Sequence, residues 1–294
     1  MGNAVEPYRE FYGLGFPDVA HEHSIQLIDA HGELLVVQYF VPPSARGTVL
    51  VVHGYYDHVG LYGHLIEYLL SRDLAVVCYD QIGHGLSSGP RATIDSFDRY
   101  VAATRAVYAA ARAHLGAPSQ QSWHWIGQSM GGAVVMETLQ QSPPAEHVGE
   151  IVLLAPLVRP YAWWFNRWVF AVAKQFIDER PRTITSNAEN PEFMALQQVD
   201  PLQARVLPVA WVQAMVDWFN RFREYPESEL APKLVQGDAD RTVDWRYTLK
   251  IYECRYPDTR HLVIPGGRHH LVNESVEIRQ AIFSWLDEHC KWHD

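Results

Sequence analysis

Short apolar segments rich in β-branched residues alternate along this chain with longer amphipathic stretches. Eight segments have the length and composition of buried strands, at residues 25–28, 34–40, 48–52, 75–79, 123–126, 151–154, 233–236 and 262–264. Helical spacing of apolar residues occurs near 61–72, 96–115, 130–141, 244–256 and 275–289. The first two strands follow one another closely and predict an antiparallel hairpin. The later alternation predicts right-handed crossovers, and hence an α/β fold with a mostly parallel sheet flanked by helices.

One long segment interrupts this alternation. Residues 157–225 show no convincing strand pattern, and their sequence is helical and aromatic, with five of the ten Trp of the chain at positions 163, 164, 168, 211 and 218. We therefore predict a helical cap at 157–225. It would be inserted between two strands of a core formed by residues 1–156 and 226–294.

Apolar residues of this cap are arranged at helical spacing. Six of them fall on one stripe: Tyr161, Trp164, Phe165, Trp168, Val172 and Phe176. Such a stripe more often packs against a core than contacts a lipid. Trp163, Val169 and Phe170 fall off the stripe and predict an apolar surface, which commonly marks a binding site.

Composition and charge narrow the classes of function. With 294 residues, of which 48% are apolar and 20% charged, the chain fits a globular protein with a large core. Its net charge of −10 argues against nucleic-acid binding and weakens any attraction to anionic membranes. The cap holds eight Lys or Arg and seven Asp or Glu, so it is nearly neutral and suits an amphiphilic substrate or an interface.

Targeting and metal-binding patterns do not stand out. We find no leader-like segment and no run of about 18 apolar residues. Three cysteines without regular spacing favour a reducing compartment, so we expect a cytoplasmic protein. No spaced set of His, Cys and carboxylate residues suggests a metal site, and we expect neither a metal nor a cofactor.

The strongest local signal is a G-x-S-x-G motif centred on Ser129, with the sequence Gly-Gln-Ser-Met-Gly-Gly at 127–132. It follows a predicted strand and opens a predicted helix, which is the context that a nucleophile elbow requires. The small glycines let the neighbouring backbone pass through a sharp turn, and the hydroxyl projects from the edge of the sheet. Ser129 is therefore the predicted nucleophile.

A serine hydroxyl is a weak nucleophile that needs a base, and the base needs a third group to orient it. In folds that carry a nucleophile elbow, the catalytic residues follow along the chain in the order Ser, acid, His, and the acid and the His each come after a later strand. The loop after the seventh predicted strand holds Asp238, Asp240 and Asp244, and the loop after the eighth holds His269 and His270. Asp244 suits a helix N-cap and Asp238 a turn, which favours Asp240. The two histidines are alternatives on these grounds.

The tetrahedral intermediate also needs hydrogen-bond donors for its oxyanion. In this fold they are the N–H of the residue after the nucleophile and an N–H from the loop after an early strand. These criteria select the backbone N–H groups of Met130 and of Tyr55, the latter in the loop after the strand at 48–52.

Five segments resemble the monoacylglycerol lipase and lysophospholipase group of the α/β-hydrolases. They are His53-Gly54 with Asp57-His58, the segment from Asp80 to Arg91 with Gly83-His84-Gly85, the elbow at 127–132, Gly237 to Val243, and Gly266 to Glu274. The resemblance covers about 25–155 and 230–290 and does not extend through the cap. It selects Asp240 as the carboxylate and His269 as the base. Tyr55 stands where a smaller residue is common in this group.

The resemblance implies a serine carboxylic-ester hydrolase that forms an acyl-enzyme on Ser129. Its implied substrates are small esters or monoacyl lipids, such as a monoacylglycerol or a lysophospholipid. Trp164 and Trp168 are predicted to contact the substrate, and the cap to make peripheral contact with a membrane. Two alternatives remain. One is a peptidase of the proline-iminopeptidase type, which would need an acidic pair such as Glu189 and Glu192, and the other is a ligand receptor without turnover.

Overall fold

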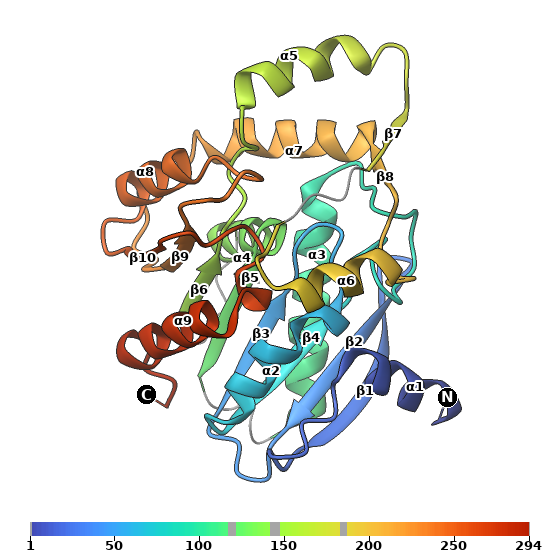
Figure 1. The fold of residues 1–294 in the computed structure, drawn as a ribbon, viewed down its shortest axis with the longest axis vertical. Helices are drawn as coiled ribbons and strands as arrows, with labels where there is room; N and C mark the ends of the chain where they lie inside the picture. Colours follow the sequence, from blue (N-terminus) through green and yellow to red (C-terminus); the bar gives the residue numbers. More distant parts are fainter. Residues whose placement is uncertain (1, 117–121, 142–147, 183–186, 294) are drawn as a thin grey trace.

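The structure, a computed structural model, describes residues 2–116, 122–141, 148–182 and 187–293 (Figure 1). At its centre is a sheet of eight strands in the spatial order β1-β2-β4-β3-β5-β6-β9-β10. The strands are β1 (Glu22–Ala30), β2 (Glu33–Val41), β3 (Gly47–Val52), β4 (Leu74–Tyr79), β5 (Trp123–Gln128), β6 (Val148–Leu154), β9 (Lys233–Gly237) and β10 (Arg260–Ile264). Each of the eight predicted strand segments lies within one of them.

Strand directions in this sheet follow the prediction. β1 pairs antiparallel with β2, and β2 pairs antiparallel with β4. The other neighbouring pairs are parallel, which confirms the mostly parallel sheet. The carboxyl ends of β3, β5, β9 and β10 therefore meet at one edge, where the sites of such sheets commonly lie.

Helices cover both faces of the sheet (Figure 1). They are α1 (Gly2–Tyr12), the 3₁₀ helix η1 (Val59–Tyr62), α2 (Gly63–Leu70), α3 (Phe97–Leu115), α4 (Met130–Gln141), α8 (Trp245–Arg255), the 3₁₀ helix η3 (Leu271–Asn273) and α9 (Val276–His289). Apolar residues of α3, α4 and α8 bury against one face, and those of α2 and α9 against the other. The sequence pattern does not predict α1.

Between β6 and β9 the chain forms a layer beyond the carboxyl edge of the sheet (Figure 1). Its elements are α5 (Trp163–Ala173), β7 (Glu179–Pro181), α6 (Pro191–Val199), β8 (Val206–Pro208) and α7 (Val209–Phe222). The antiparallel pair β7–β8 contradicts the expectation of a segment without strands, because three residues are too few to show an alternating pattern. We call the segment 157–225 the cap, and its separation from the core as a domain stays a prediction.

The predicted orientation of the aromatic stripe on α5 is wrong. Trp164 is 70% exposed, Trp168 68% and Phe176 79%, so the stripe faces solvent. Trp163 is 4% exposed instead, and its ring packs against Phe219 of α7 with 5.0 Å between centroids. α5 carries apolar residues on both sides, and periodicity alone does not say which side meets the core.

Buried polar contacts fasten α7 to the core. Trp218 Nε1 donates to Glu137 Oε2 at 3.1 Å, and the Tyr225 hydroxyl donates to Glu137 Oε1 at 2.7 Å. Arg221 forms an ion pair with the same carboxylate at 3.0 Å, and the Trp218 ring stacks on Phe97 at 5.2 Å. A buried carboxylate needs such partners, so these contacts hold α7 in one position.

A second buried contact fastens α6. His58, in the loop after β3, lies 2.8 Å from Asp200 at the end of α6, and both side chains are fully buried. The Tyr12 hydroxyl of α1 donates to the other oxygen of Asp200 at 2.7 Å. The loop after β3, α1 and α6 are thereby joined at a single carboxylate.

Candidate active site

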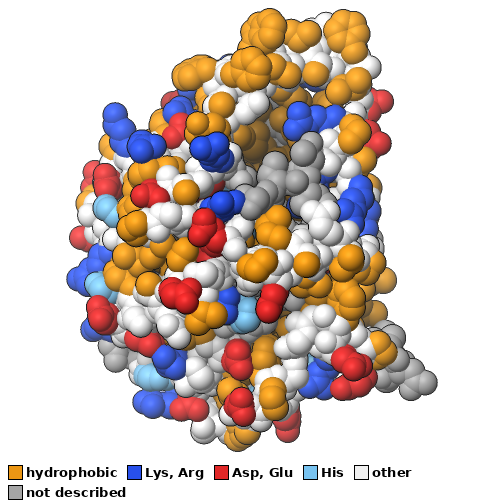
Figure 2. All heavy atoms as spheres, viewed as in Figure 1, with side chains coloured by type: hydrophobic (Ala, Val, Ile, Leu, Met, Phe, Trp, Pro, Cys, Tyr) orange, Lys and Arg blue, Asp and Glu red, His pale blue; other side chains and the backbone are white. Residues whose placement is uncertain are grey.

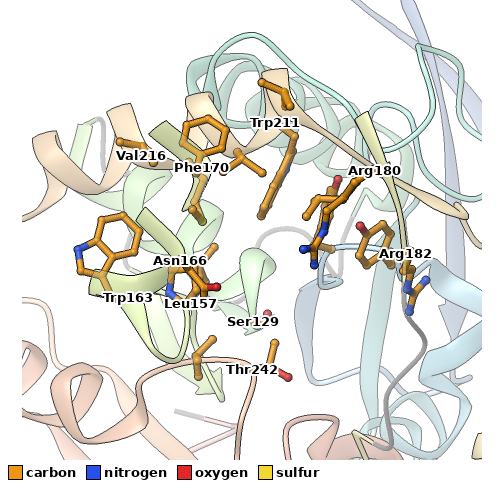
Figure 3. Close-up of a pocket in the computed structure, with 18 of the residues that line it drawn as sticks. Ser129, Leu157, Trp163, Asn166, Phe170, Arg180, Arg182, Trp211, Val216 and Thr242 are labelled. Atoms are coloured by element: carbon orange, nitrogen blue, oxygen red, sulfur yellow. The ribbon is translucent and has the colours of Figure 1, made fainter. Parts of the chain in front are cut away.

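Ser129 lies in the turn between β5 and α4, at the carboxyl edge of the sheet (Figure 3). Its φ of 53° falls in the left-handed region, which costs energy for a residue with a Cβ. A Cβ on Gly127 would lie 2.5 Å from the carbonyl oxygen of Gly131, and one on Gly131 would overlap the carbonyl oxygen of Val52. Both positions therefore require glycine, and the packed turn holds the serine hydroxyl where the strands end.

The structure brings the three predicted triad residues together. His269 Nε2 lies 2.9 Å from Ser129 Oγ, and His269 Nδ1 lies 2.7 Å from Asp240 Oδ2. Asp240 Oδ1 accepts hydrogen bonds from the backbone N–H groups of Thr242 at 2.7 Å and Val243 at 3.1 Å. Hydroxyl, imidazole and carboxylate thus stand in the order that activates a serine nucleophile.

Burial and pairing act in opposite directions on the two ionisable members. Burial raises the pKa of Asp240, but the imidazole of His269 and the two backbone donors outweigh it, so this pKa lies below its ordinary value. Burial lowers the pKa of His269, but the Asp240 carboxylate outweighs it, so this pKa lies above its ordinary value. An ionised Asp240 accepts from Nδ1–H, which leaves Nε2 free to take the Ser129 proton.

The neighbouring candidates have other partners. Asp244 is the N-cap of α8 and accepts a backbone N–H of its first turn at 3.2 Å, as the sequence predicts. Asp238 accepts a backbone N–H of the histidine loop at 2.7 Å. His270 Nε2 lies 3.1 Å from Asp57 Oδ2, in the loop after β3, rather than beside the serine.

A buried chain of hydrogen bonds, which the sequence does not reveal, joins the loop after β3 to the histidine loop. Gly54 N–H donates to the Tyr62 hydroxyl at 3.0 Å, and this hydroxyl donates to Asp57 Oδ2 at 2.9 Å. The same oxygen contacts His270, whose Nδ1 lies 3.3 Å from Asn273 Nδ2. The chain fixes the loop of the predicted oxyanion donor relative to the loop of the base.

The predicted oxyanion donors flank the serine. Met130 begins α4, where the first N–H groups lack partners within the helix. A Cβ on Gly54 would lie 3.3 Å from Ser129 Cβ, so the loop that carries Tyr55 passes beside the nucleophile. The Tyr55 ring stacks on Trp211 of α7 with 3.7 Å between centroids. These positions suit an oxyanion hole, and the role of both N–H groups stays a prediction.

A cavity of about 400 Å³ opens onto Ser129 and His269 beneath the cap (Figure 3). Much of its wall is apolar and comes from α5 and α7: Trp163, Val169, Phe170, Ala173, Trp211, Val212, Met215 and Val216. Trp164 and Trp168, the tryptophans predicted to contact the substrate, do not line this cavity because they stand on the outer face of α5. The neighbouring Trp163 and Phe170 line the cavity instead.

Sequence reasoning missed three further residues that line the cavity. Trp211 has no local signal beyond its place in an aromatic segment. Arg180 lies in β7 and Arg182 directly follows it, and so short a strand leaves no readable pattern. Only the pairing with β8 shows which way these side chains point.

The chain has a mostly parallel sheet flanked by helices, and at the carboxyl edge of that sheet a serine, a histidine and an aspartate are in hydrogen-bond contact beside a largely apolar cavity. This combination defines a serine hydrolase. The family described as "Serine aminopeptidase, S33" matches residues 43–276, and the chain belongs to this family. The chain is a serine ester hydrolase of the α/β-hydrolase fold that resembles the monoacylglycerol lipases, which confirms the class predicted from the sequence.

Individual relatives support this class along nearly the whole chain. The monoglyceride lipase of Homo sapiens is 26% identical, over 96% of this chain and 93% of its own length. The monoacylglycerol lipase of Mycolicibacterium smegmatis is 27% identical, over 91% and 97%. Among solved structures, the Paleococcus ferrophilus monoacylglycerol lipase superposes with a TM-score of 0.71 at 22% identity, over 87% of this chain and 99% of that one.

Replacing triad residues should remove ester turnover while the protein stays folded. We expect Ser129→Ala and His269→Ala each to lower kcat by about 10⁴-fold or more on p-nitrophenyl butyrate. The double variant should be hardly slower than either single one, because triad members act as a unit. Asp238→Asn, which keeps an oxygen acceptor in the neighbouring turn, is the matched control. Full activity in His269→Ala would contradict the assignment of the base.

The pH profile should reflect the raised pKa of His269. Its imidazole must be neutral to accept the serine proton, so kcat/KM should be low in acid and rise with pH. Because Asp240 raises this pKa, we expect the midpoint above the ordinary histidine value of about 6.5. Asp240→Asn should shift the midpoint downward and lower the rate. A profile that is flat between about pH 5 and 9 would show that no histidine of this kind limits the reaction.

Proposed function

We propose that this chain hydrolyses the carboxylic ester of monoacyl lipids, such as a monoacylglycerol or a lysophospholipid. The observation that carries the proposal is the cavity of about 400 Å³ beneath the cap, which runs from the Ser129–His269 pair between apolar side chains of α5 and α7. Such a wall suits one hydrocarbon chain, whose burial contributes about 0.8 kcal/mol per methylene. The relatives named above as lipases of monoacylglycerols agree with this substrate class.

The proposed reaction proceeds through an acyl-enzyme. His269 Nε2 takes the proton of Ser129 Oγ as the oxygen attacks the ester carbonyl carbon. The N–H groups of Met130 and Tyr55 stabilise the oxyanion that forms, and Asp240 stabilises the imidazolium. His269 then passes the proton to the departing alkoxide, which leaves as an alcohol. Water repeats the sequence on the acyl-enzyme and releases the fatty acid.

A peptidase activity fits the cavity less well. An aminopeptidase needs an acidic group for the free amine of its substrate. Glu189 and Glu192, the acidic pair considered from the sequence, do not line the cavity, and Glu189 lies 3.4 Å from Arg268. Among the described residues that line it, the single carboxylate is Asp57, which already contacts His270 and Tyr62. The cavity therefore favours a substrate without a cation.

We further propose that α5 contacts a lipid surface. Its outer face exposes four large apolar side chains, Trp164, Phe165, Trp168 and Val172, and Phe176 in the segment that follows is exposed as well. Figure 2 shows hydrophobic side chains gathered at the top of the molecule, with a hollow in the surface below them. No described helix is long and apolar enough to cross a membrane. An exposed apolar patch beside a lipid-sized cavity is suited to peripheral contact.

Chain length should determine the rate if the cavity holds the acyl group. We expect kcat/KM for dissolved esters to rise from acetyl to decanoyl by up to about fourfold per methylene. Ala173→Phe, which fills the cavity from α5, should reduce the decanoyl-to-acetyl ratio. Ala171→Phe, at an exposed position of the same helix outside the cavity, is the control. A flat response in the unmodified protein, or triolein as the best substrate, would refute the monoacyl proposal.

Loss of the outer aromatic face should weaken binding to a lipid surface. Trp164→Ser with Trp168→Ser should lower binding to phosphatidylcholine vesicles, measured by flotation, and slow turnover of monoacylglycerol held in them. Hydrolysis of dissolved p-nitrophenyl butyrate should change little, because neither side chain lines the cavity. Trp245→Ser, in α8 of the core, is the matched control. Unchanged flotation would exclude α5 as the contact.

A further inference from the structure

Arg180 and Arg182 are presented to the cavity by the short β7–β8 pair. Alternate residues of a strand point to the same side, so these two arginines share a face while Pro181 between them points away. The backbone pairing continues past β7, since Arg182 N–H donates to Arg205 O at 2.8 Å. Leu207, opposite Arg180 in β8, lines the cavity as well. The paired backbone therefore fixes the side of the strand from which both arginine side chains project.

The surroundings of Arg182 leave its charge without an anionic partner. Its Nη1 donates to Gln203 Oε1 at 2.7 Å and to Ala204 O at 3.3 Å, and its guanidinium lies 3.9 Å from the centre of the Tyr56 ring. Burial lowers the pKa of Arg182. Within the described residues, neither Arg180 nor Arg182 forms an ion pair with a carboxylate. A partly desolvated cation with only neutral contacts gains most from an anion supplied by a ligand.

The charge of the cavity wall is opposite to that of the whole chain. The chain has a net charge of −10, whereas the described wall carries Arg167, Arg180 and Arg182 against the single acid Asp57. Asp57 acts on Arg182 through space, but its Oδ2 atom is occupied by His270 and Tyr62. The wall therefore has an excess of positive charge where the substrate would bind.

Three apolar side chains and the Arg180–Arg182 pair lie on different sides of this cavity, whose wall also includes Arg167 of α5 and Leu207 opposite Arg180. In Figure 3, Trp163, Phe170 and Val216 lie to one side of Ser129, and Arg180 and Arg182 to the other. An ester bound at Ser129 would place its acyl chain against the apolar side and its alcohol part against the arginines. The two halves of an amphiphile are thus separated about the nucleophile.

We propose that Arg180 and Arg182 form a binding site for an anionic group on the alcohol part of the substrate. This inference rests on the proposed function and specifies its substrate class: monoacyl esters that carry a phosphate or carboxylate are preferred over neutral ones. The planar fork of arginine suits both anions, because it donates two parallel hydrogen bonds. Phosphate is the stronger expectation, since its oxygens can engage both arginines.

The kinetic test compares esters that differ only in this group. We expect kcat/KM for 1-decanoylglycerol 3-phosphate to exceed that for 1-decanoylglycerol by about tenfold or more, at concentrations below micelle formation. Arg180→Gln with Arg182→Gln should lower this ratio at least about fivefold, and the Lys pair should keep more of it. Raising the salt concentration should also lower the ratio, because Arg180 is exposed. A wild-type ratio near one, or a ratio that the Gln pair leaves unchanged, would overturn the proposal.

Arg223→Gln is the control for Arg180→Gln alone, because each variant removes one positive charge. Arg223 lies in the cap, pairs with exposed Glu224 at 3.2 Å and does not line the cavity. It should leave the phosphate-to-neutral ratio as in the unmodified protein. Arg180→Gln alone keeps the test informative if the double variant fails to fold, since the Arg180 side chain is exposed and forms no ion pair with any carboxylate of the described ranges.

A binding test separates this inference from the hydrolytic proposal. Calorimetry on Ser129→Ala with decyl phosphate, decyl hemisuccinate and decyl glyceryl ether reports the cationic site without turnover. We expect decyl phosphate to bind about tenfold more tightly than the ether, and this difference to be lost in the added Gln pair. Equal affinities would overturn the anion site even if esters are hydrolysed. A phosphate preference in a protein that hydrolyses no ester would support the site and refute the proposed function.

Discussion

The close approach of the Ser129 turn to the end of β3 is the constraint on which the site depends. Gly131 has no room for a side chain against Val52, so the start of α4 touches the neighbouring strand. This contact places the N–H of Met130 and the loop of Tyr55 beside one serine hydroxyl. Parallel strands then bring the acid and histidine loops to the same edge, since all their carboxyl ends lie there. Local strain at Ser129 is the cost of this convergence.

Three buried carboxylates connect the loops of the core to one another and to the cap. Asp57 joins the loop after β3 to His270, and Asp200 joins it to α6 through His58. Removing the partner of a buried carboxylate is costly, because the carboxylate then stays desolvated without a hydrogen bond to compensate. Glu137 fastens α7 in the same way. Among the described contacts, α5 has no comparable buried carboxylate; it packs on α7 through Trp163 and Phe219.

How much could be predicted differs between core and cap for a physical reason. Ser129, Asp240 and His269 follow strands in a fixed order, and the topology of a parallel sheet turns that order into proximity. The face that α5 presents is not readable in this way, because a helix that is apolar on both sides gives no preferred direction. Arg180 and Arg182 were missed because β7 has three residues, and only its pairing with β8 defines the side to which they point.

The net charge of the chain, the apolar outer face of α5 and the arginines of the cavity act over different distances. Each can therefore discriminate between different properties of a lipid. Charges further apart than about 8 Å are largely screened at physiological ionic strength, so the acidic body repels an anionic surface without cancelling the arginines inside the cavity. The outer face of α5 is apolar, and the proposed lipid contact would depend on exposed hydrocarbon at an interface rather than on its charge. Selection among individual molecules is left to the cavity. There, under the proposals made above, Trp163 and Phe170 would contact the acyl chain, and the guanidinium groups would contact the group attached to the ester oxygen. The same cap can therefore combine an outer face that does not depend on the charge of the lipid surface with a cavity that prefers an anionic headgroup.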